Sequence, residues 1–324
     1  MPNLPEWPAK AAVAGAGRMG GGIAEAFATA GVAVTIADAD PAQGRAALER
    51  LKRRVAGHVE AGLLPADAQE RVATVELVDT PAEAAAGADL VVEAVTEDYG
   101  VKEAVLGEVS AAAPSAAVIA SNTSSLDIER LAGFVARPER FLGAHWFNPP
   151  EWTPAVELIP AATTDHAHVE RLRAFLAAIG KAPAEVRPAV GFVANRLQMA
   201  LFAEAIRCLD EGLASAAEID EIARSSFGFR LPFFGPFQIA DMAGLDVYRA
   251  VLESHVDAYG DRFDVRAAFA NHVDPERTGT SGGTGFYDYG EPGGDDLDTQ
   301  RDVRYAALAK LLEERPPLHF EEAQ

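Results

Sequence analysis

The chain has 324 residues, and its 28 lysines and arginines against 49 aspartates and glutamates give a formal net charge of −21. This length allows about two domains, the 49% apolar content excludes wholesale disorder, and the acidic balance argues against nucleic acid or an anionic membrane as a partner. With one cysteine, Cys208, no signal-peptide pattern and no apolar run long enough to span a bilayer, we expect a cytoplasmic protein without disulfides.

Short apolar runs alternate with helical patterns along the first half of the chain. Each run is a few residues long and is bounded by glycine, aspartate or asparagine, which is typical of buried parallel strands. The alternation predicts an α/β domain with a parallel-rich sheet and helices on both faces. The runs span 11–16, 32–37, 88–95, 117–120 and 141–147, and helical stretches between them span 41–62 and 98–113.

Helical patterns alone continue in the second half of the chain. The stretch 192–209 is apolar on nearly every face, so we expect this helix to be buried, either in a domain core or between subunits. Ser215 and Glu218 form a capping-box pattern that begins the next helix, and the Gly- and Asp-rich stretch 290–298 predicts an exposed loop. The predicted domains are an α/β domain over 1–187 and an all-α domain over 188–324.

A glycine-rich turn lies between the first predicted strand and the first predicted helix. In a GxGxxG pattern the first glycine allows the tight turn, the second lets the backbone approach a pyrophosphate, and the third lets the helix pack on the strand. Asp38 ends the second strand, where a carboxylate accepts hydrogen bonds from the adenosine ribose, and residues 39–41 include no cation for a 2′-phosphate. The sequence therefore predicts NAD rather than NADP. The predicted cofactor contacts here are Gly15, Gly17, Arg18, Met19, Gly20 and Asp38.

Polar side chains follow the later strands of the predicted sheet, at the edge where such sheets bind ligands. Residues 121–125 follow one strand, His145 and Asn148 lie at the end of the next, and Glu157 lies inside the apolar run 155–160. A histidine can exchange a proton with a carbinol oxygen while a hydride moves to nicotinamide, and a carboxylate would orient it. The spacing leaves open whether His145 meets Glu157 and whether this histidine is catalytic or structural.

Several of these segments together make the chain resemble the 3-hydroxyacyl-CoA dehydrogenase family over nearly its whole length. The segments are AGAGRMGGGIA, ADLVVEAVTEDYGVK, ASNTSSL, GAHWFNPP with the following VEL, GFVANRL, GPFQIADMAGLDV and GFYDY. The resemblance implies an N-terminal Rossmann-like domain, a helical C-terminal substrate and dimerisation domain, a homodimer, and a site in the cleft between the domains. It also implies a role in fatty acid metabolism.

The resemblance assigns roles to individual residues. It implies that His145 is the acid/base and that Glu157 orients it, while Ser124 and Asn195 contact the reacting oxygen of a small-molecule substrate. Ser124 also matches a nicotinamide contact. Further matches to cofactor-facing positions are Asn148, Glu97 and Lys102, and no metal ligand is assigned.

Two departures from the family pattern concern the substrate. Family members that bind CoA commonly place lysine and serine after the second strand, where this chain keeps cations only at Lys52–Arg54, and the lysine near GFY is missing. Arg230, just before GPF, resembles branches that act on gulonate, carnitine or polyketide intermediates. It could clamp a substrate carboxylate or form a domain-interface salt bridge. Arg54 and Arg230 are therefore candidate substrate contacts.

Three functions follow from this reading. The leading one is an NAD-dependent dehydrogenase that interconverts a 3-hydroxyacyl thioester and its 3-keto form. The second is a dehydrogenase or ketoreductase with the same mechanism and a substrate without CoA. The third is a non-catalytic, crystallin-like structural protein, against which the presence of His145, Glu157, Ser124 and Asn195 argues.

Overall fold

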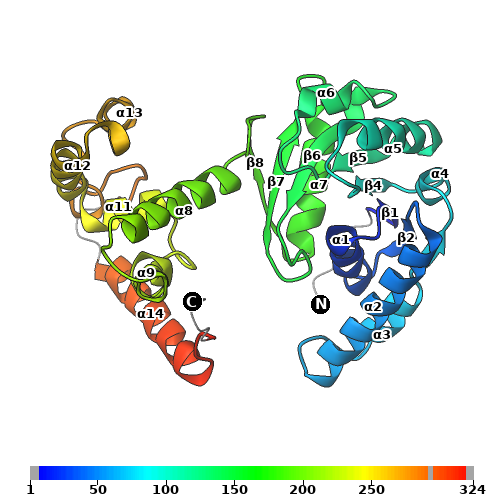
Figure 1. Cartoon of the computed structure of the whole chain (residues 1–324), viewed down its shortest axis with the longest axis horizontal. Helices are drawn as coiled ribbons and strands as arrows, with labels where there is room; N and C mark the ends of the chain where they lie inside the picture. The colour runs from blue at the N-terminus through cyan, green and yellow to red at the C-terminus, as the bar shows by residue number, and fades with distance from the viewer. Residues whose placement is uncertain (1–6, 291–294, 319–324) are drawn as a thin grey trace. The chain divides into compact units, whose positions relative to one another are not determined.

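The computed structural model describes residues 7–290 and 295–318 and divides into two compact units, Met1–Ala200 and Leu201–Gln324 (Figure 1). The first unit is an α/β domain around one sheet, and the second is helical. No helix in the described part of the chain is long and apolar enough to cross a membrane.

The first unit contains an eight-stranded sheet with the order β3-β2-β1-β4-β5-β6-β7-β8. All neighbouring strands are parallel except β6 and β7, which are antiparallel. The predicted parallel-rich α/β architecture is therefore confirmed, with β3 and β8 as strands that the sequence pattern did not indicate. The strands are β1 (Lys10–Ala14), β2 (Ala33–Ala37), β3 (Glu76–Val78), β4 (Leu90–Glu93), β5 (Val118–Ser121), β6 (Phe141–Trp146), β7 (Ala155–Pro160) and β8 (Ala182–Glu185).

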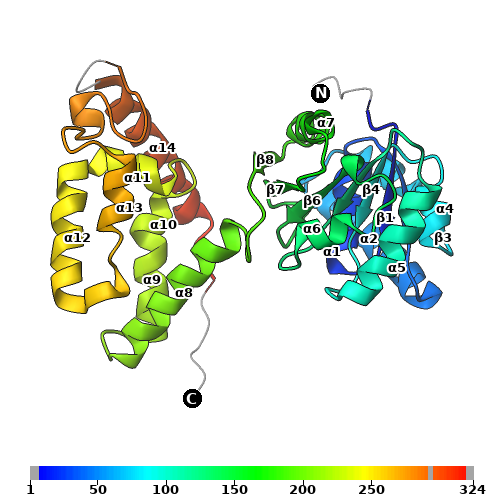
Figure 2. The ribbon, with the colours of Figure 1, turned by 90° about the horizontal axis from the view of Figure 1, so that it is seen from above.

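Helices cover both faces of this sheet because successive strand side chains point to opposite faces (Figure 2). In β1, Ala11 and Val13 pack with α1, α2, α3 and α7, whereas Ala12 and Ala14 pack with α4, α5 and α6. The helices of this unit are α1 (Arg18–Thr29), α2 (Pro41–Glu60), α3 (Ala68–Ala73), α4 (Pro81–Ala85), α5 (Tyr99–Ala112), α6 (Ile128–Ala132) and α7 (His166–Ala178), with the short 3-10 helix η1 (Pro138–Arg140).

The change from strands to helices falls between β8 and α8 (Ala194–Asp210), and α8 itself runs across the division at Ala200. The second unit has a small buried cluster around Ala240, Leu245 and Val273. The predicted capping box is present at the start of α9, where Ser215 and Glu218 bond reciprocally. The remaining helices are α9 (Ala216–Ser225), α10 (Phe227–Arg230), α11 (Pro236–Ala243), α12 (Leu245–Tyr259), α13 (Arg266–His272) and α14 (Asp295–Glu314), with η2 (Gly260–Arg262) and η3 (Thr280–Gly282).

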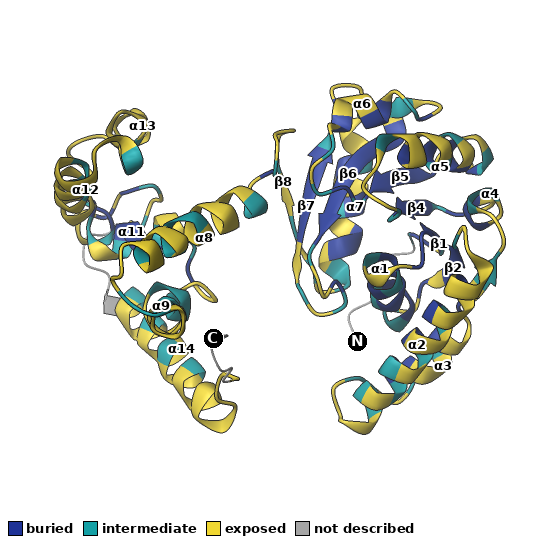
Figure 3. Cartoon of the chain, viewed as in Figure 1, coloured by how far each residue is buried: buried dark blue, intermediate teal, exposed yellow. Residues whose placement is uncertain are grey.

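Helix α8 is not buried within the single chain, although we expected burial either in a domain core or between subunits. None of its residues is buried (Figure 3). Large apolar side chains such as Leu197, Phe202 and Ile206 are about half exposed. A helix that is apolar on most faces needs cover on more than one side. The described residues of the single chain do not supply that cover, so the expected burial of this helix in a domain core is not observed.

The predicted loop over residues 290–298 is also corrected in part. Residues 291–294 lie outside the described residues, but α14 begins at Asp295 and includes the rest of the stretch. Carboxylates near a helix N-terminus interact favourably with its dipole, so Asp296 and Asp298 suit a first helical turn as well as a loop.

Candidate active site

The glycine-rich turn after β1 leaves room for a ligand at the start of α1. Gly15 has a φ of +104°, and a Cβ there would lie 2.6 Å from the carbonyl oxygen of Ala94. A Cβ on Gly20 would lie 1.9 Å from the carbonyl oxygen of Gly15, so helix and turn are in close contact. Gly17 caps α1 without a side-chain bond, and a Cβ there would meet nothing within 4 Å. The first turn holds no acidic side chain, so its N–H groups suit a pyrophosphate.

Asp38 lies beside this turn at the end of β2. Its carboxylate accepts hydrogen bonds from the backbone N–H of Ala16 at 2.8 Å and of Asp40 at 3.0 Å. Asp40 caps α2, and the hydrogen bonds from the Ala42 N–H and from Gln43 lower the pKa of its carboxyl. Two carboxylates at this position suit ribose hydroxyls and would repel a 2′-phosphate.

Glu97 organises the segment that follows β5. Its Oε1 accepts hydrogen bonds from the Thr123 hydroxyl and the Ser124 N–H, both at 2.7 Å, and from the Ser125 N–H at 2.9 Å. Burial raises the pKa of Glu97, but these hydrogen bonds and the charge of Lys102 outweigh it, and the net shift is downward. Glu97 therefore orients Ser124 as an ionised carboxylate.

Lys102 does not face the cofactor site directly, because its side chain is fully buried. Its Nζ lies 2.6 Å from Glu93 Oε1 and 3.4 Å from Glu97 Oε2, and the Ser121 hydroxyl donates to the other oxygen of Glu93 at 2.5 Å. Lys102 reaches the cavity through Glu97 and through the carbonyl oxygen of Val95, to which its Nζ donates at 3.4 Å. The sequence reasoning missed Glu93, although a carboxylate inside the apolar run 88–95 signals a buried partner.

The antiparallel pairing of β6 and β7 brings His145 and Glu157 directly opposite each other. Nδ1 of His145 lies 2.8 Å from Glu157 Oε2, and both residues are only 5% exposed. Glu157 Oε1 accepts from the backbone N–H groups of Val193 and Ala194, each at 2.9 Å. Both carboxylate oxygens are thus used, and the imidazole is held by one of them.

Phe147 and Phe192 enclose the imidazole of His145, and the sequence reasoning did not identify either. Their ring centroids lie 4.5 and 5.5 Å from that of the histidine. Phe192 has a φ of +46°, which is uncommon for a residue other than glycine. This turn presents the two N–H groups to Glu157, so we interpret its strained backbone as part of the site.

A cavity of about 660 Å³ in the first unit opens onto His145. Ser124 and Asn195 also line it, and Asn195 Nδ2 donates to the Ser124 carbonyl oxygen at 3.5 Å. Asn122, from the predicted polar segment 121–125, also lines the cavity, whereas Gln198 is a lining residue that the sequence reasoning missed. The predicted site residues that the structure brings to this cavity are Met19, Glu97, Ser124, His145, Asn148 and Asn195.

Arg54 and Arg230 do not line this cavity. Arg54 donates from Nε to Glu25 Oε2 at 2.6 Å and lies 3.4 Å from Glu151 Oε1. Arg230 lies in the helical unit, where it lines a cavity of about 250 Å³ with Arg301 and Tyr305. Among the described residues the side chain of Arg230 has no hydrogen-bond or ion-pair partner, so its role stays a prediction.

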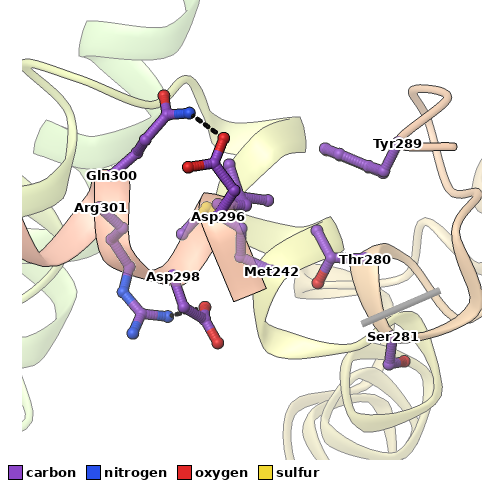
Figure 4. Close-up of a pocket in the computed structure, with 9 residues that line it drawn as sticks. Met242, Thr280, Ser281, Tyr289, Asp296, Asp298, Gln300 and Arg301 are labelled. Atoms are coloured by element: carbon purple, nitrogen blue, oxygen red, sulfur yellow. Dashed lines mark hydrogen bonds and ion pairs between the residues drawn. The ribbon is translucent and has the colours of Figure 1, made fainter. Parts of the chain in front are cut away.

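The helical unit contains a second cavity, of about 530 Å³, which holds none of the predicted site residues (Figure 4). Four of its polar side chains bond in pairs: Arg301 to Asp298 at 2.7 Å and Gln300 to Asp296 at 2.6 Å. These internal bonds leave it a weaker candidate for chemistry than the cavity at His145.

A dinucleotide-binding sheet, an open phosphate turn and a polar cavity at the strand ends define a nicotinamide-dependent oxidoreductase. Comparison with known proteins agrees. Residues 10–189 match the model of the 3-hydroxyacyl-CoA dehydrogenase NAD binding domain, and residues 191–289 match that of the 3-hydroxyacyl-CoA dehydrogenase C-terminal domain. The chain belongs to the 3-hydroxyacyl-CoA dehydrogenase family. It is an NAD-dependent dehydrogenase that acts on a hydroxyl group, which sets aside the non-catalytic alternative.

Two curated relatives differ in the substrate that their names state. A probable 3-hydroxybutyryl-CoA dehydrogenase of Bacillus subtilis is 34% identical over 280 residues, covering 86% of this chain and 96% of that protein. A 5-formyl-3-hydroxy-2-methylpyridine 4-carboxylate 5-dehydrogenase of Mesorhizobium japonicum is 32% identical over 307 residues, covering 94% and 98%. Among solved structures, a 3-hydroxyacyl-CoA dehydrogenase of Archaeoglobus fulgidus matches with a TM-score of 0.77 and 30% identity, covering 94% of this chain and 99% of that one.

Proposed function

We propose that this enzyme interconverts a secondary alcohol and its ketone, with His145 as the acid/base and Glu157 as the group that orients it. NAD supplies the hydride acceptor in the oxidative direction. Nδ1 of His145 faces Glu157 at 2.8 Å, and Nε2 makes no hydrogen bond within the described residues. The proton of the substrate hydroxyl therefore moves to Nε2, and the Glu157 carboxylate stabilises the resulting imidazolium.

The residues that share the cavity with His145 have complementary tasks in this proposal. The Ser124 hydroxyl and the Asn195 amide hold the reacting oxygen beside the imidazole, and Asn148 and Glu97 lie on the cofactor side. In the reductive direction the oxygen of the 3-keto substrate develops negative charge as the hydride arrives, and hydroxyl and amide donors stabilise that charge. The buried imidazole–carboxylate pair that opens into this polar cavity is the observation that carries the proposal.

The first candidate substrate is a 3-hydroxyacyl thioester of the CoA type, which would place the enzyme in fatty acid metabolism. The second is a small hydroxy acid or β-ketone without CoA. Arg54 favours the second, because it is engaged by Glu25 and Glu151 instead of being available to a phosphate. The relative that acts on a pyridine carboxylate also covers more of this chain than the butyryl-CoA relative does.

A substrate panel separates these candidates. NADH absorbance at 340 nm would be followed with acetoacetyl-CoA in the reductive direction, and with gulonate and carnitine in the oxidative direction. Activity on the thioester alone supports the first candidate, and activity on the free acids alone supports the second. No turnover with any member would contradict both. A preference for NADP would contradict the role assigned to Asp38.

We also propose that the enzyme is a cytoplasmic homodimer whose helical unit covers the exposed face of α8 with a second copy. Large apolar side chains on α8, including Leu201, Phe202 and Ile206, are otherwise about half exposed, and patches of this kind mark protein interfaces. Phe202→Glu should shift the molecular mass in solution from dimer to monomer, measured by light scattering. A monomeric wild-type protein would contradict this assembly.

A further inference from the structure

The loop of residues 147–154 joins β6 to β7 and brings two residues to the cavity at His145. Phe147 packs on the imidazole, and Asn148 lines the cavity on the side that we assign to the cofactor. We propose that Glu25, Arg54 and Lys181 are positioning residues that fix this loop against the dinucleotide-binding helix α1. The effect on catalysis rests on the function proposed above, whereas the effect on the loop and on NADH binding does not.

Arg54 ties the loop to α1 through two carboxylates. Glu25 on α1 is 1% exposed, and the guanidinium of Arg54 on α2 bonds to it while lying 3.4 Å from Glu151 of the loop. Burial raises the pKa of Glu25, and the charge and hydrogen bonds of Arg54 oppose that rise. Without Arg54, the cation between Glu25 and Glu151 would be lost. His58, with Nδ1 3.5 Å from Glu25 Oε1, contacts only Glu25, so repulsion between the two carboxylates would move the loop away.

Lys181, just before β8, holds the same loop from its other side. Its ammonium donates to three loop carbonyl oxygens: Pro150 at 2.6 Å, Thr153 at 3.0 Å and Glu151 at 3.2 Å. Burial lowers the pKa of Lys181, and the charge of Glu151 opposes that shift. An ammonium has three donors, so Lys181 uses its full bonding capacity on one loop.

Gly22 shows how closely the loop lies against α1. A Cβ at Gly22 would be 2.4 Å from Glu151 Oε2 and 2.5 Å from Pro150 Cγ. The loop therefore touches the helix whose first turn suits the pyrophosphate. Its other contacts reach α2, where the ring of His58 lies 5.1 Å from that of Trp152. These contacts set the position of Asn148 relative to α1. In our assignment α1 holds the pyrophosphate of the dinucleotide and Asn148 lies at its nicotinamide end, so the loop fixes the distance between the two contacts.

The two test variants are Glu151→Gln, which removes the loop-side charge, and Lys181→Met, which removes the three carbonyl contacts. Neither leaves the buried Glu25 without its arginine, so both should fold. Arg53→Met is the matched control, because Arg53 is exposed and has no hydrogen-bond or ion-pair partner among the described residues.

Hydrogen exchange and NADH binding are the readouts. The Trp152 and Thr153 N–H groups bond to the Pro149 carbonyl oxygen, so exchange in a peptide over 147–154 reports on the loop. We expect faster exchange in both variants, a dissociation constant for NADH that rises about three- to tenfold, and recovery of protection when NADH is added. Arg53→Met should match the wild type in all three measurements.

Two results would overturn this assignment: unchanged loop exchange in both variants, or faster exchange with unchanged NADH affinity. His145→Gln keeps the two proposals separate. It should abolish most turnover while NADH affinity stays as in the wild type. Normal turnover in His145→Gln would reject the acid/base proposal, and the loop measurements would still stand on their own.

Discussion

Replacing Glu157 by glutamine is the sharpest test of the acid/base pair. The substitution keeps the shape of the side chain, and one amide oxygen can still accept from Val193 and Ala194. The amide nitrogen then faces His145 Nδ1 at the position where the carboxylate lay at 2.8 Å. An N–H group cannot accept from an imidazole N–H, so Nδ1 must become the acceptor. The tautomer reverses, Nε2 carries the proton, and His145 can no longer accept one from the substrate hydroxyl.

We expect Glu157→Gln to lower kcat by about 10²–10⁴-fold, which corresponds to ~3–5 kcal/mol at 1.36 kcal/mol per tenfold. The assay is NADH formation at 340 nm with whichever substrate of the panel the wild type oxidises, together with NADH affinity by fluorescence. Affinity should stay within about twofold, since Glu157 does not line the cavity. Glu170→Gln, at an exposed glutamate, is the control. Turnover within threefold of the wild type would refute the tautomer argument.

Three further predictions concern the cofactor side of the site. Lys102→Met leaves Glu93 buried without its cation and should lower the free energy of unfolding by about 3–5 kcal/mol in urea titrations. Lys52→Met, at a partly exposed lysine, is the control and should change the free energy of unfolding little. Equal losses in the two variants would contradict the stabilising role of the buried pair. Asp38→Ala should weaken NADH binding and raise the affinity for NADPH relative to NADH about tenfold or more, measured by fluorescence titration. An unchanged ratio of the two affinities would contradict the idea that the Asp38 carboxylate repels a 2′-phosphate. Glu97 has a pKa below its ordinary value of 4.5, so its stabilising contribution is full above that pH and is lost as the pH falls through its lowered pKa. Thermal unfolding at about pH 6 and about pH 3.5 should therefore show a larger acid loss in the wild type than in Glu97→Gln.

Local sequence patterns were sufficient for much of the architecture. The GxGxxG turn, the short apolar strands and the helices between them depend on neighbouring residues, and the structure has them within two residues of the predicted bounds. The pattern failed where composition is ambiguous. Residues 295–298 looked like a loop because aspartate suits both loops and first helical turns.

Contacts between residues far apart in the sequence could be identified only from the tertiary structure. The sequence presented Lys52–Arg54 as three equivalent cations, but only folding places Arg54 between Glu25 and Glu151, each on a different element. Lys102 matched a cofactor-facing position, yet its side chain is fully buried against Glu93. Periodicity reports which face of an element is apolar and says nothing about which charged partner from elsewhere meets it.

The sequence by itself determined the class of this protein: a dinucleotide-binding sheet followed by helices, with NAD preferred because a carboxylate ends β2. The tertiary structure alone decided that His145 and Glu157 form a pair. They lie on strands whose antiparallel register sets them opposite each other at 2.8 Å. A shift of one residue would point Glu157 to the other face of the sheet, and register depends on packing across the whole domain.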